Sequence, residues 1–334
     1  MNQLAADRKA DQSPLLRVRG LNVSYGSTER PVRAVADADL AIYPGEIVGV
    51  AGESGSGKTT LCTAMLRALP STARIDGSVD FAGRSLFDLN EAEMRRLRGR
   101  DIAMILQNPM TSLDPLFTIG NQLGEVLQTH QPKLRGSAAR ERATELLRRV
   151  HITAPESRLR QYPHQMSGGM KQRILTAMAT SSSPRLLIAD EPTTALDVTI
   201  QEEILALFHE IRERAGVAIV IITHDLDVIR RVCDRILVMY AGRIVEDGPV
   251  DEVFAAPAHP YTKGLLDSLP HVENGSIVLS SIPGQVPSLS ELGKGCSFAD
   301  RCPRAVPACR ESQPPEIALN PAHRAFCHRI EGLT

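Results

Sequence analysis

The chain has 334 residues, and 38 lysines and arginines against 39 aspartates and glutamates give it a formal net charge of −1. This near balance excludes a protein that binds nucleic acid through overall positive charge, while 43% hydrophobic and 23% charged residues are typical of a globular protein. The length suggests about two domains, and no apolar stretch approaches the ~20 residues that a membrane-spanning helix needs.

The N-terminal part of the chain predicts strands and then a glycine-rich loop. Residues 1–12 are polar and lack the apolar core of a secretory signal, so we expect a cytosolic protein. Apolar patterns predict strands over residues 15–25 and 34–42. A short apolar strand over 46–51 is followed at once by glycines and then by a helical pattern over 58–69.

The rest of the chain alternates between strands and helices, with one long helical stretch. Strands are predicted over 78–81 and 101–105, and the pattern from about 115 to 180 is mostly helical. A third group of elements follows: strands over 186–189, 218–223 and 235–240, with a helix over 198–215. This alternation predicts an α/β fold with a largely parallel sheet and an inserted helical subdomain at about 115–180.

Proline becomes frequent near the C-terminus. Half of the 22 prolines lie after residue 248, and four of the six cysteines cluster there as well. We therefore expect an irregular, cysteine-containing extension after the core.

The segment GESGSGKTT, Gly52 to Thr60, fits the phosphate-binding pattern G-x-x-x-x-G-K-[ST] between a strand and a helix. Its glycines let the backbone approach phosphate oxygens without a clashing Cβ, and its N–H groups lie beside the positive end of the next helix. Lys58 can reach the β- and γ-phosphates, and the Thr59 hydroxyl can bind Mg²⁺. A glycine-rich turn without a ligand is the alternative, and the strand and helix on either side argue against it.

The segment LLIADEP, Leu186 to Pro192, is an apolar strand that ends in two acids. Ligands of open α/β sheets gather at the carboxyl ends of the strands. Asp190 is therefore placed to hold Mg²⁺, and Glu191 to polarise an attacking water. The alternative is a surface turn with two solvated acids.

A third motif, MSGGMKQR, begins at Met166 and opens a helical pattern. Ser167, Gly168 and Gly169 offer a hydroxyl and two bare backbone positions at a helix N-terminus, which is a second anion-binding surface. Two such surfaces in one chain suggest that nucleotide is held between two subunits.

With these motifs the sequence resembles the nucleotide-binding subunit of ABC transporters over about residues 15–255, with the motifs in the family's order. The resemblance implies a P-loop NTPase (RecA-like) core, an antiparallel β lobe, the helical subdomain, and a C-terminal extension over 256–334. Met166 and Gln165 stand where the family often has Leu and Glu; the first change nearly preserves volume and polarity.

The resemblance implies a role for each motif residue. Tyr25 matches the aromatic that stacks on adenine, Gln107 the residue that senses the γ-phosphate and Mg²⁺, and His224 the switch histidine. Glu191, His224 and Gln107 would be catalytic, and Thr59, Gln107 and Asp190 would hold Mg²⁺. The ATP contacts within the chain would be Tyr25, Gly52, Ser54, Gly55, Ser56, Gly57, Lys58, Thr59 and Thr60. The contacts to the partner subunit's ATP would be Ser167, Gly168, Gly169, Gln172 and, in the D-loop 195–197, Asp197.

Three further segments, 107–120, 258–270 and 282–289, resemble the oligopeptide, dipeptide and nickel importers of this family. This branch implies a peptide-import ATPase at the cytoplasmic face of the membrane, with two permease subunits, a second, related ATPase and an extracytoplasmic solute-binding protein. A nickel or other small-solute importer is the alternative. An ABC ATPase of DNA repair or translation would need a coiled-coil insertion or two cassettes in the chain, and neither is seen.

The C-terminal cysteines have the spacing C-x5-C-x6-C-x17-C. Four thiolates can hold Zn²⁺ or an iron–sulfur cluster, and the wide spacing fits a cluster better than zinc knuckles. The branch resemblance also implies a [4Fe–4S] cluster, for which we expect a structural role apart from ATP hydrolysis. Zinc, or thiols and disulfides, are the alternatives. The four residues are Cys296, Cys302, Cys309 and Cys327.

Overall fold

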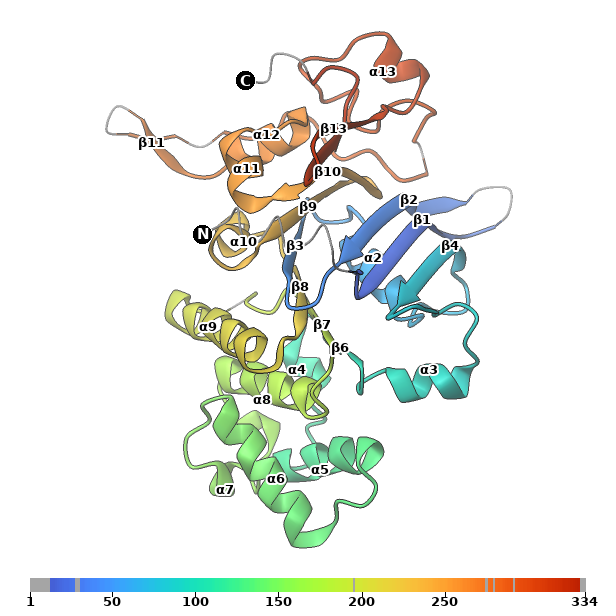
Figure 1. Ribbon diagram of the computed structural model, residues 1–334. Coiled ribbons are helices and arrows are strands. Elements are labelled where there is room, and N and C mark those ends of the chain that lie inside the picture. The colour runs from blue at the N-terminus through green and yellow to red at the C-terminus, as the bar shows by residue number, and fades with distance from the viewer. Residues whose placement is uncertain are drawn as a thin grey trace. The chain divides into compact units, whose positions relative to one another are not determined.

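The computed structural model describes residues 13–27, 31–194, 196–273, 276–278, 280–290 and 292–330 (Figure 1). The chain forms two compact units: residues up to 88 together with those from 222 onward form unit 1, and residues 89–221 form unit 2. No described helix is long and apolar enough to cross a membrane. The polar segment 1–12 and Ala195 of the predicted D-loop lie outside the described residues.

Unit 1 contains a four-stranded antiparallel sheet in the order β2-β1-β4-β5. β1 buries alternate residues, such as Leu16 and Val18, and this period-two pattern is what identifies it in the sequence. Leu16 lies opposite Ile42 on one side and opposite Phe81 on the other. The strands are β1 (Leu16–Tyr25), β2 (Val32–Ile42), β4 (Arg74–Phe81) and β5 (Arg84–Ser85).

The second group of strands in unit 1 follows the order β13-β14-β10-β9-β3. β3 and β9 are parallel, whereas β9, β10, β14 and β13 pair antiparallel in succession. Every residue of β3 is buried, as expected for a strand covered on both faces. The strands are β3 (Ile47–Ala51), β9 (Arg235–Tyr240), β10 (Arg243–Pro249), β13 (Glu316–Asn320) and β14 (His323–Phe326).

The helices of unit 1 are short. α2 follows β3 after the glycine-rich loop and ends earlier than predicted, because Arg67 has a left-handed φ of +48°. A hairpin of β11 (His271–Glu273) and β12 (Ser276–Val278) follows α12 (Pro260–Asp267) in the chain. The helices are α2 (Lys58–Met65), α10 (Leu226–Val232), α11 (Val250–Ala255), α12 (Pro260–Asp267) and α13 (Ala308–Glu311).

The C-terminal extension is more regular than its proline content predicts. β13 and β14 continue the strand order beyond β10, and α12 packs on β10 (Figure 1). Tyr261 and Phe298 are fully buried beside Tyr240 of β9, with ring centroids 4.5 Å (Tyr240–Tyr261) and 5.2 Å (Tyr240–Phe298) apart. Such aromatic pairs stabilise a core by more than the burial of their apolar area alone. Because the three aromatic residues are spaced irregularly in the sequence, no sequence pattern predicts this core.

Unit 2 combines the strand order β8-β7-β6 with the predicted helical subdomain. β6 and β7 are parallel, which confirms the parallel arrangement expected here. Apolar side chains from several helices, among them Leu123, Leu147 and Ile174, form the helical core. The strands are β6 (Ile102–Ile105), β7 (Leu186–Asp190) and β8 (Ala218–Ile222). The helices are α3 (Glu91–Leu97), α4 (Pro109–Ser112), α5 (Ile119–His130), α6 (Gly136–Arg149), α7 (Pro155–Arg158), η1 (Pro163–Gln165), α8 (Gly168–Thr180) and α9 (Val198–Ala215).

Candidate functional site

The loop from Gly52 to Thr60, called the phosphate loop below, is packed so closely that two of its positions admit only glycine. Gly52 has φ +147°, and a Cβ there would lie 2.2 Å from the carbonyl oxygen of Met239. Gly57 has φ +96°, and a Cβ would lie 2.3 Å from the carbonyl oxygen of Ala34. The loop backbone is therefore held against β2 and β9, in a conformation that other residues cannot adopt.

Lys58, the first residue of α2, turns its side chain back over this loop. Its ammonium donates hydrogen bonds to the carbonyl oxygens of Gly52 at 2.7 Å and Glu53 at 2.9 Å, and contacts the Ser56 hydroxyl at 3.4 Å. The side chain is buried, whereas Ser54, Gly55 and Thr59 are exposed. The loop thus combines a positive charge at its centre with accessible positions around it, which suits a phosphate chain.

His224 and Tyr25 belong to the same unit as the phosphate loop. Thr223 donates its backbone N–H to the carbonyl oxygen of Val50 at 3.2 Å, so Thr223 lies beside the end of β3. The exposed His224 therefore leaves the sheet at the same edge as the phosphate loop. Tyr25 is half-buried at the end of β1.

In unit 2 the register of β6 and β7 brings three predicted residues to one sheet edge. Ile105 lies opposite Ala189 in the parallel pair. Gln107 follows Ile105 by two residues, and Glu191 follows Ala189 by two residues, so both emerge at the same end of the strands. Asp190 is the last residue of β7 and is 2% exposed.

Glu191 has a backbone that few non-glycine residues adopt. Its φ is +49°, in the left-handed region, and the residue is 9% exposed. The carboxylate accepts a hydrogen bond of 2.5 Å from the hydroxyl of Thr194. Thr194 was not among the predicted site residues. Its only sequence signal is its position three residues after Glu191.

The segment from Ser167 to Gln172, called the signature motif below, lies at a capped helix start. Ser167 caps α8, since its hydroxyl accepts a hydrogen bond of 3.3 Å from the N–H of Met170. Asp197 caps α9 in the same way, accepting from Ile200 at 2.9 Å. A Cβ at Gly169 would lie 2.4 Å from the Ile200 side chain, so glycine lets the two helix starts approach.

The other signature positions differ in exposure. Ser167, Gly168 and Asp197 are exposed, whereas Gln172 is buried. The side-chain oxygen of Gln165 accepts a hydrogen bond of 2.8 Å from the N–H of Tyr162. A glutamate at this position could accept the same bond, so the departure from the family pattern keeps the local cap.

Large apolar side chains are exposed close to Gln107 in the sequence. Leu106 is 56% exposed and Met110 63%, while Leu116 and Phe117 are 79% and 50% exposed. Exposed apolar groups of this kind mark surfaces that bind other proteins or membranes. We call these four residues the apolar patch.

The four C-terminal cysteines all line one small pocket, called the cysteine pocket below, together with His259 and Phe298. No two of the six cysteines form a disulfide. The pocket therefore confirms that cysteines up to 31 positions apart in the sequence come together. Among the described residues, however, no group of three or more His, Cys, Asp or Glu side chains is arranged as a metal site.

Backbone N–H groups point at the sulfurs of this pocket in a repeated way. Cys296, Cys302 and Cys327 each accept a hydrogen bond from the backbone two residues further on, at Phe298, Arg304 and Arg329. The last of these is 3.4 Å long. Burial, together with a smaller effect of the nearby thiols, raises the pKa of Cys296 to about 11. The remaining cysteines, Cys62 and Cys233, are buried in the core.

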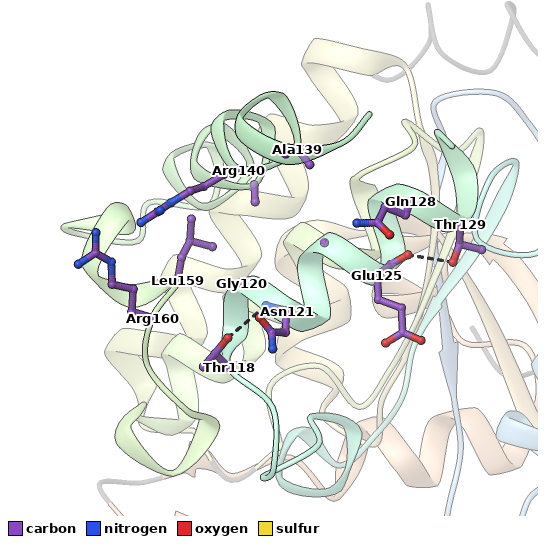
Figure 2. A pocket seen from close by; sticks show the side chains of 13 residues that line it. Thr118, Gly120, Asn121, Glu125, Gln128, Thr129, Ala139, Arg140, Leu159 and Arg160 are labelled. Atoms are coloured by element: carbon purple, nitrogen blue, oxygen red, sulfur yellow. Dashed lines mark hydrogen bonds between the residues drawn. The ribbon is translucent and has the colours of Figure 1, made fainter. Parts of the chain in front are cut away.

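A pocket of unit 2, of about 850 Å³, lies among helices and contains none of the predicted site residues (Figure 2). Arg140 and Arg160 lie at one end of it, and Glu125 and Gln128 at the other. Small residues such as Gly120 and polar side chains both line it. The sequence contains no motif for this pocket.

Comparison with known proteins identifies two matching family models. Residues 35–194 match the model described as ABC transporter, and residues 245–309 match the model described as oligopeptide/dipeptide transporter, C-terminal region. The first match contains the phosphate loop, Gln107, the signature motif and both acids. The second contains three of the four cysteines of the pocket.

The chain is 49% identical over 330 residues to a probable peptide ABC transporter ATP-binding protein of Sinorhizobium fredii, covering 98% of each chain. It is 41% identical to the oligopeptide transport ATP-binding protein OppD of Salmonella typhimurium, again covering 98% of each. Among solved structures, the dimeric ATP-binding cassette MJ0796 bound to ADP and Pi is similar, with a TM-score of 0.63 and 28% identity. That match covers 70% of this chain and 98% of the cassette.

Proposed function

This chain belongs to the ATP-binding subunits of ABC transporters, and on that premise we propose that it powers the import of peptides through membrane permease subunits. ABC transporter subunits of this kind hydrolyse ATP to drive transport. The observation that carries the assignment is the phosphate loop, in which Gly52 and Gly57 leave no room for a Cβ and Lys58 lies over the loop. The match of residues 245–309 supports peptide as the solute.

We assign the chemistry to residues that the family resemblance and the geometry both favour. Lys58 and the loop amides bind the phosphates, with Ser54, Gly55, Ser56 and Thr60 along the loop, and Tyr25 stacks on adenine. Water attacks the γ-phosphorus in line, the bond to the bridging oxygen breaks, and ADP leaves. Glu191 orients this water or takes its proton.

Mg²⁺ suits the oxygen donors of this chain. Asp190 supplies a carboxylate at the end of β7, Thr59 a hydroxyl at the start of α2, and Gln107 an amide oxygen after β6. Bound Mg²⁺ would neutralise charge that develops on the phosphate oxygens. His224 would contact the γ-phosphate from its position after β8.

A second ATPase subunit completes the proposed site. Ser167, Gly168 and Asp197 are exposed at two neighbouring helix starts, whereas the lysine of this motif, Lys171, is buried and its ammonium contacts the sulfur of Met110. They would contact ATP held by the partner's phosphate loop, with Gln172 behind them. The partner is proposed to be a related but different chain.

The permease subunits would bind at the apolar patch beside Gln107. Four exposed apolar side chains within twelve residues are costly in water and gain from burial against a partner. This surface would link the state of the nucleotide to the membrane subunits and hold the chain at the cytoplasmic face of the membrane. A solute-binding protein outside the membrane would deliver the peptide.

We also propose that the cysteine pocket holds a [4Fe–4S] cluster with a structural role. Four thiols around one pocket fit the ligand set of such a cluster. The repeated N–H bonds to sulfur also support it, because hydrogen bonds to ligand sulfurs stabilise bound clusters. Zinc remains the alternative metal.

The function is tested by reconstituting the chain with its permeases and second ATPase in vesicles. Peptide uptake should require Mg·ATP and stop in Lys58→Ala, because the phosphate loop loses its only lysine; Lys263→Ala on an exposed helix position is the matched control. Uptake of Ni²⁺ without peptide uptake would favour the nickel alternative. ATP binding by Lys58→Ala equal to that of the unmodified chain in calorimetry would refute the phosphate-loop assignment.

A further inference from the structure

The C-terminal extension touches the phosphate loop directly, through Glu53. Arg301, which lies immediately before Cys302, donates two hydrogen bonds to the Glu53 carboxylate, at 2.7 Å and 3.1 Å. This is the paired geometry in which a guanidinium binds a carboxylate most strongly. The two residues are 248 positions apart in the sequence, and both belong to unit 1.

A second contact holds the backbone of the same residue. Glu53 donates its backbone N–H to the hydroxyl of Tyr261 at 2.9 Å. Tyr261 belongs to α12 and is fully buried. Both the main chain and the side chain of Glu53 are thus fixed by residues that follow β10 in the chain, while the Glu53 carbonyl oxygen accepts a hydrogen bond from Lys58.

Arg301 is itself held rigidly. Its side chain is 6% exposed, and its remaining donors bind the carbonyl oxygens of Pro283 at 2.9 Å and Ile282 at 3.3 Å. The guanidinium also lies 5.7 Å from the ring centroid of Tyr240. A side chain with this many fixed partners loses little entropy when it binds a carboxylate, so it can act as a preorganised support.

The contact of Arg301 with Glu53 affects ATP binding because Glu53 is negatively charged. Its carboxylate is 30% exposed and lies in a loop that must accept a polyphosphate. An anion at that place repels the ligand unless a cation neutralises it. The ion pair with Glu53 also raises the pKa of Arg301, so the guanidinium stays charged at every physiological pH.

We propose that Arg301 is a positioning residue for ATP binding: from the cysteine-bearing extension it neutralises Glu53 and holds the phosphate loop in its binding conformation. This rests on the proposed role of the phosphate loop. The extension therefore contributes to ATP affinity, in addition to any role in holding a metal.

The test measures Mg·ATP affinity by calorimetry and KM and kcat for ATP hydrolysis in the assembled complex. Arg301→Gln should weaken ATP binding about five- to fiftyfold, and KM should rise while kcat changes less than about twofold. Arg301→Lys should recover part of the affinity, since it keeps the charge but loses the paired geometry. Arg310→Gln is the matched control: it also neighbours a cysteine, but its ion pair with Asp300 is exposed, and affinity should stay unchanged.

A double substitution separates the electrostatic role from general damage to the fold. Glu53→Gln combined with Arg301→Gln should bind ATP more tightly than Arg301→Gln alone, because the uncompensated charge is gone. Equal affinities for Arg301→Gln and the unmodified chain would overturn the proposal, and so would a double variant no better than the single one. If Arg301→Gln does not fold, Arg301→Lys supplies the same comparison.

Lys58→Ala in the same assay keeps the two hypotheses apart. Loss of binding in Lys58→Ala with unchanged binding in Arg301→Gln would refute the role of Arg301 alone. Unchanged binding in Lys58→Ala would instead refute the phosphate loop as the ATP site.

Discussion

The hydroxyl of Thr194 donates a hydrogen bond to the carboxylate of Glu191, three residues before it in the chain. Glu191 has a left-handed backbone and follows a fully buried strand. The direction of this carboxylate is therefore set by both its own backbone and its neighbour. A group that must orient one water gains from such restraint, because catalysis depends on the position of the reacting groups.

Glu191→Gln should separate ATP binding from hydrolysis. The amide keeps the size of the side chain but cannot accept a proton, so hydrolysis should fall about 10²- to 10⁴-fold, while Mg·ATP still binds and a closed dimer accumulates. Phosphate release and calorimetry measure the two effects. Glu213→Gln, on the exposed surface of α9, is the control and should hydrolyse ATP normally. Normal turnover in Glu191→Gln would mean that another residue positions the water.

Thr194→Val removes the hydroxyl and keeps the shape of the side chain. Glu191 should then adopt several orientations, and kcat should fall about three- to thirtyfold with little change in ATP affinity. Thr194→Ser should retain most of the activity, since it restores the donor. Steady-state kinetics of the unmodified chain, Thr194→Val and Thr194→Ser test this prediction. Equal kcat values for Thr194→Val and the unmodified chain would show that the hydrogen bond has no part in catalysis.

Ser167→Arg should prevent two ATPase subunits from closing on ATP, because the bulky cation occupies the exposed start of α8. The variant subunit should still bind ATP through its own phosphate loop. Loss of the helix cap alone costs about 1 kcal/mol of stability, so Ser167→Ala, which loses the cap without added bulk, is the control. Cross-linking of the assembled complex with ATP monitors closure; normal closure in Ser167→Arg would contradict a site shared between subunits.

Protein purified without oxygen should be brown and contain about four iron and four sulfide ions per chain. Replacing Cys296, Cys302, Cys309 or Cys327 singly by serine should remove the colour and loosen the extension, as measured by limited proteolysis. Cys233→Ala, a core position outside the pocket, should keep the iron. Stoichiometric zinc without iron would establish the zinc alternative.

Short motifs determined much of this protein from the sequence alone. The phosphate loop, the acids after β7 and the signature helix are encoded by residues within a few positions of one another, and strand and helix patterns around them are equally local. Predicted and observed bounds coincide for α9 and β9. The sequence also indicated a cysteine cluster, because four cysteines lie within 32 residues at the C-terminus.

The way in which the extension meets the core follows from packing between distant segments of the chain. Nothing near Arg301 in the sequence points to Glu53, since the contact depends on where the aromatic core of Tyr240, Tyr261 and Phe298 places the extension. The hydrogen bond from Thr194 likewise follows from a left-handed backbone that no local pattern specifies. The local spacing of residues specifies which helices, strands and loops form. Contacts between distant segments depend instead on packing, which involves all the side chains that fill the core.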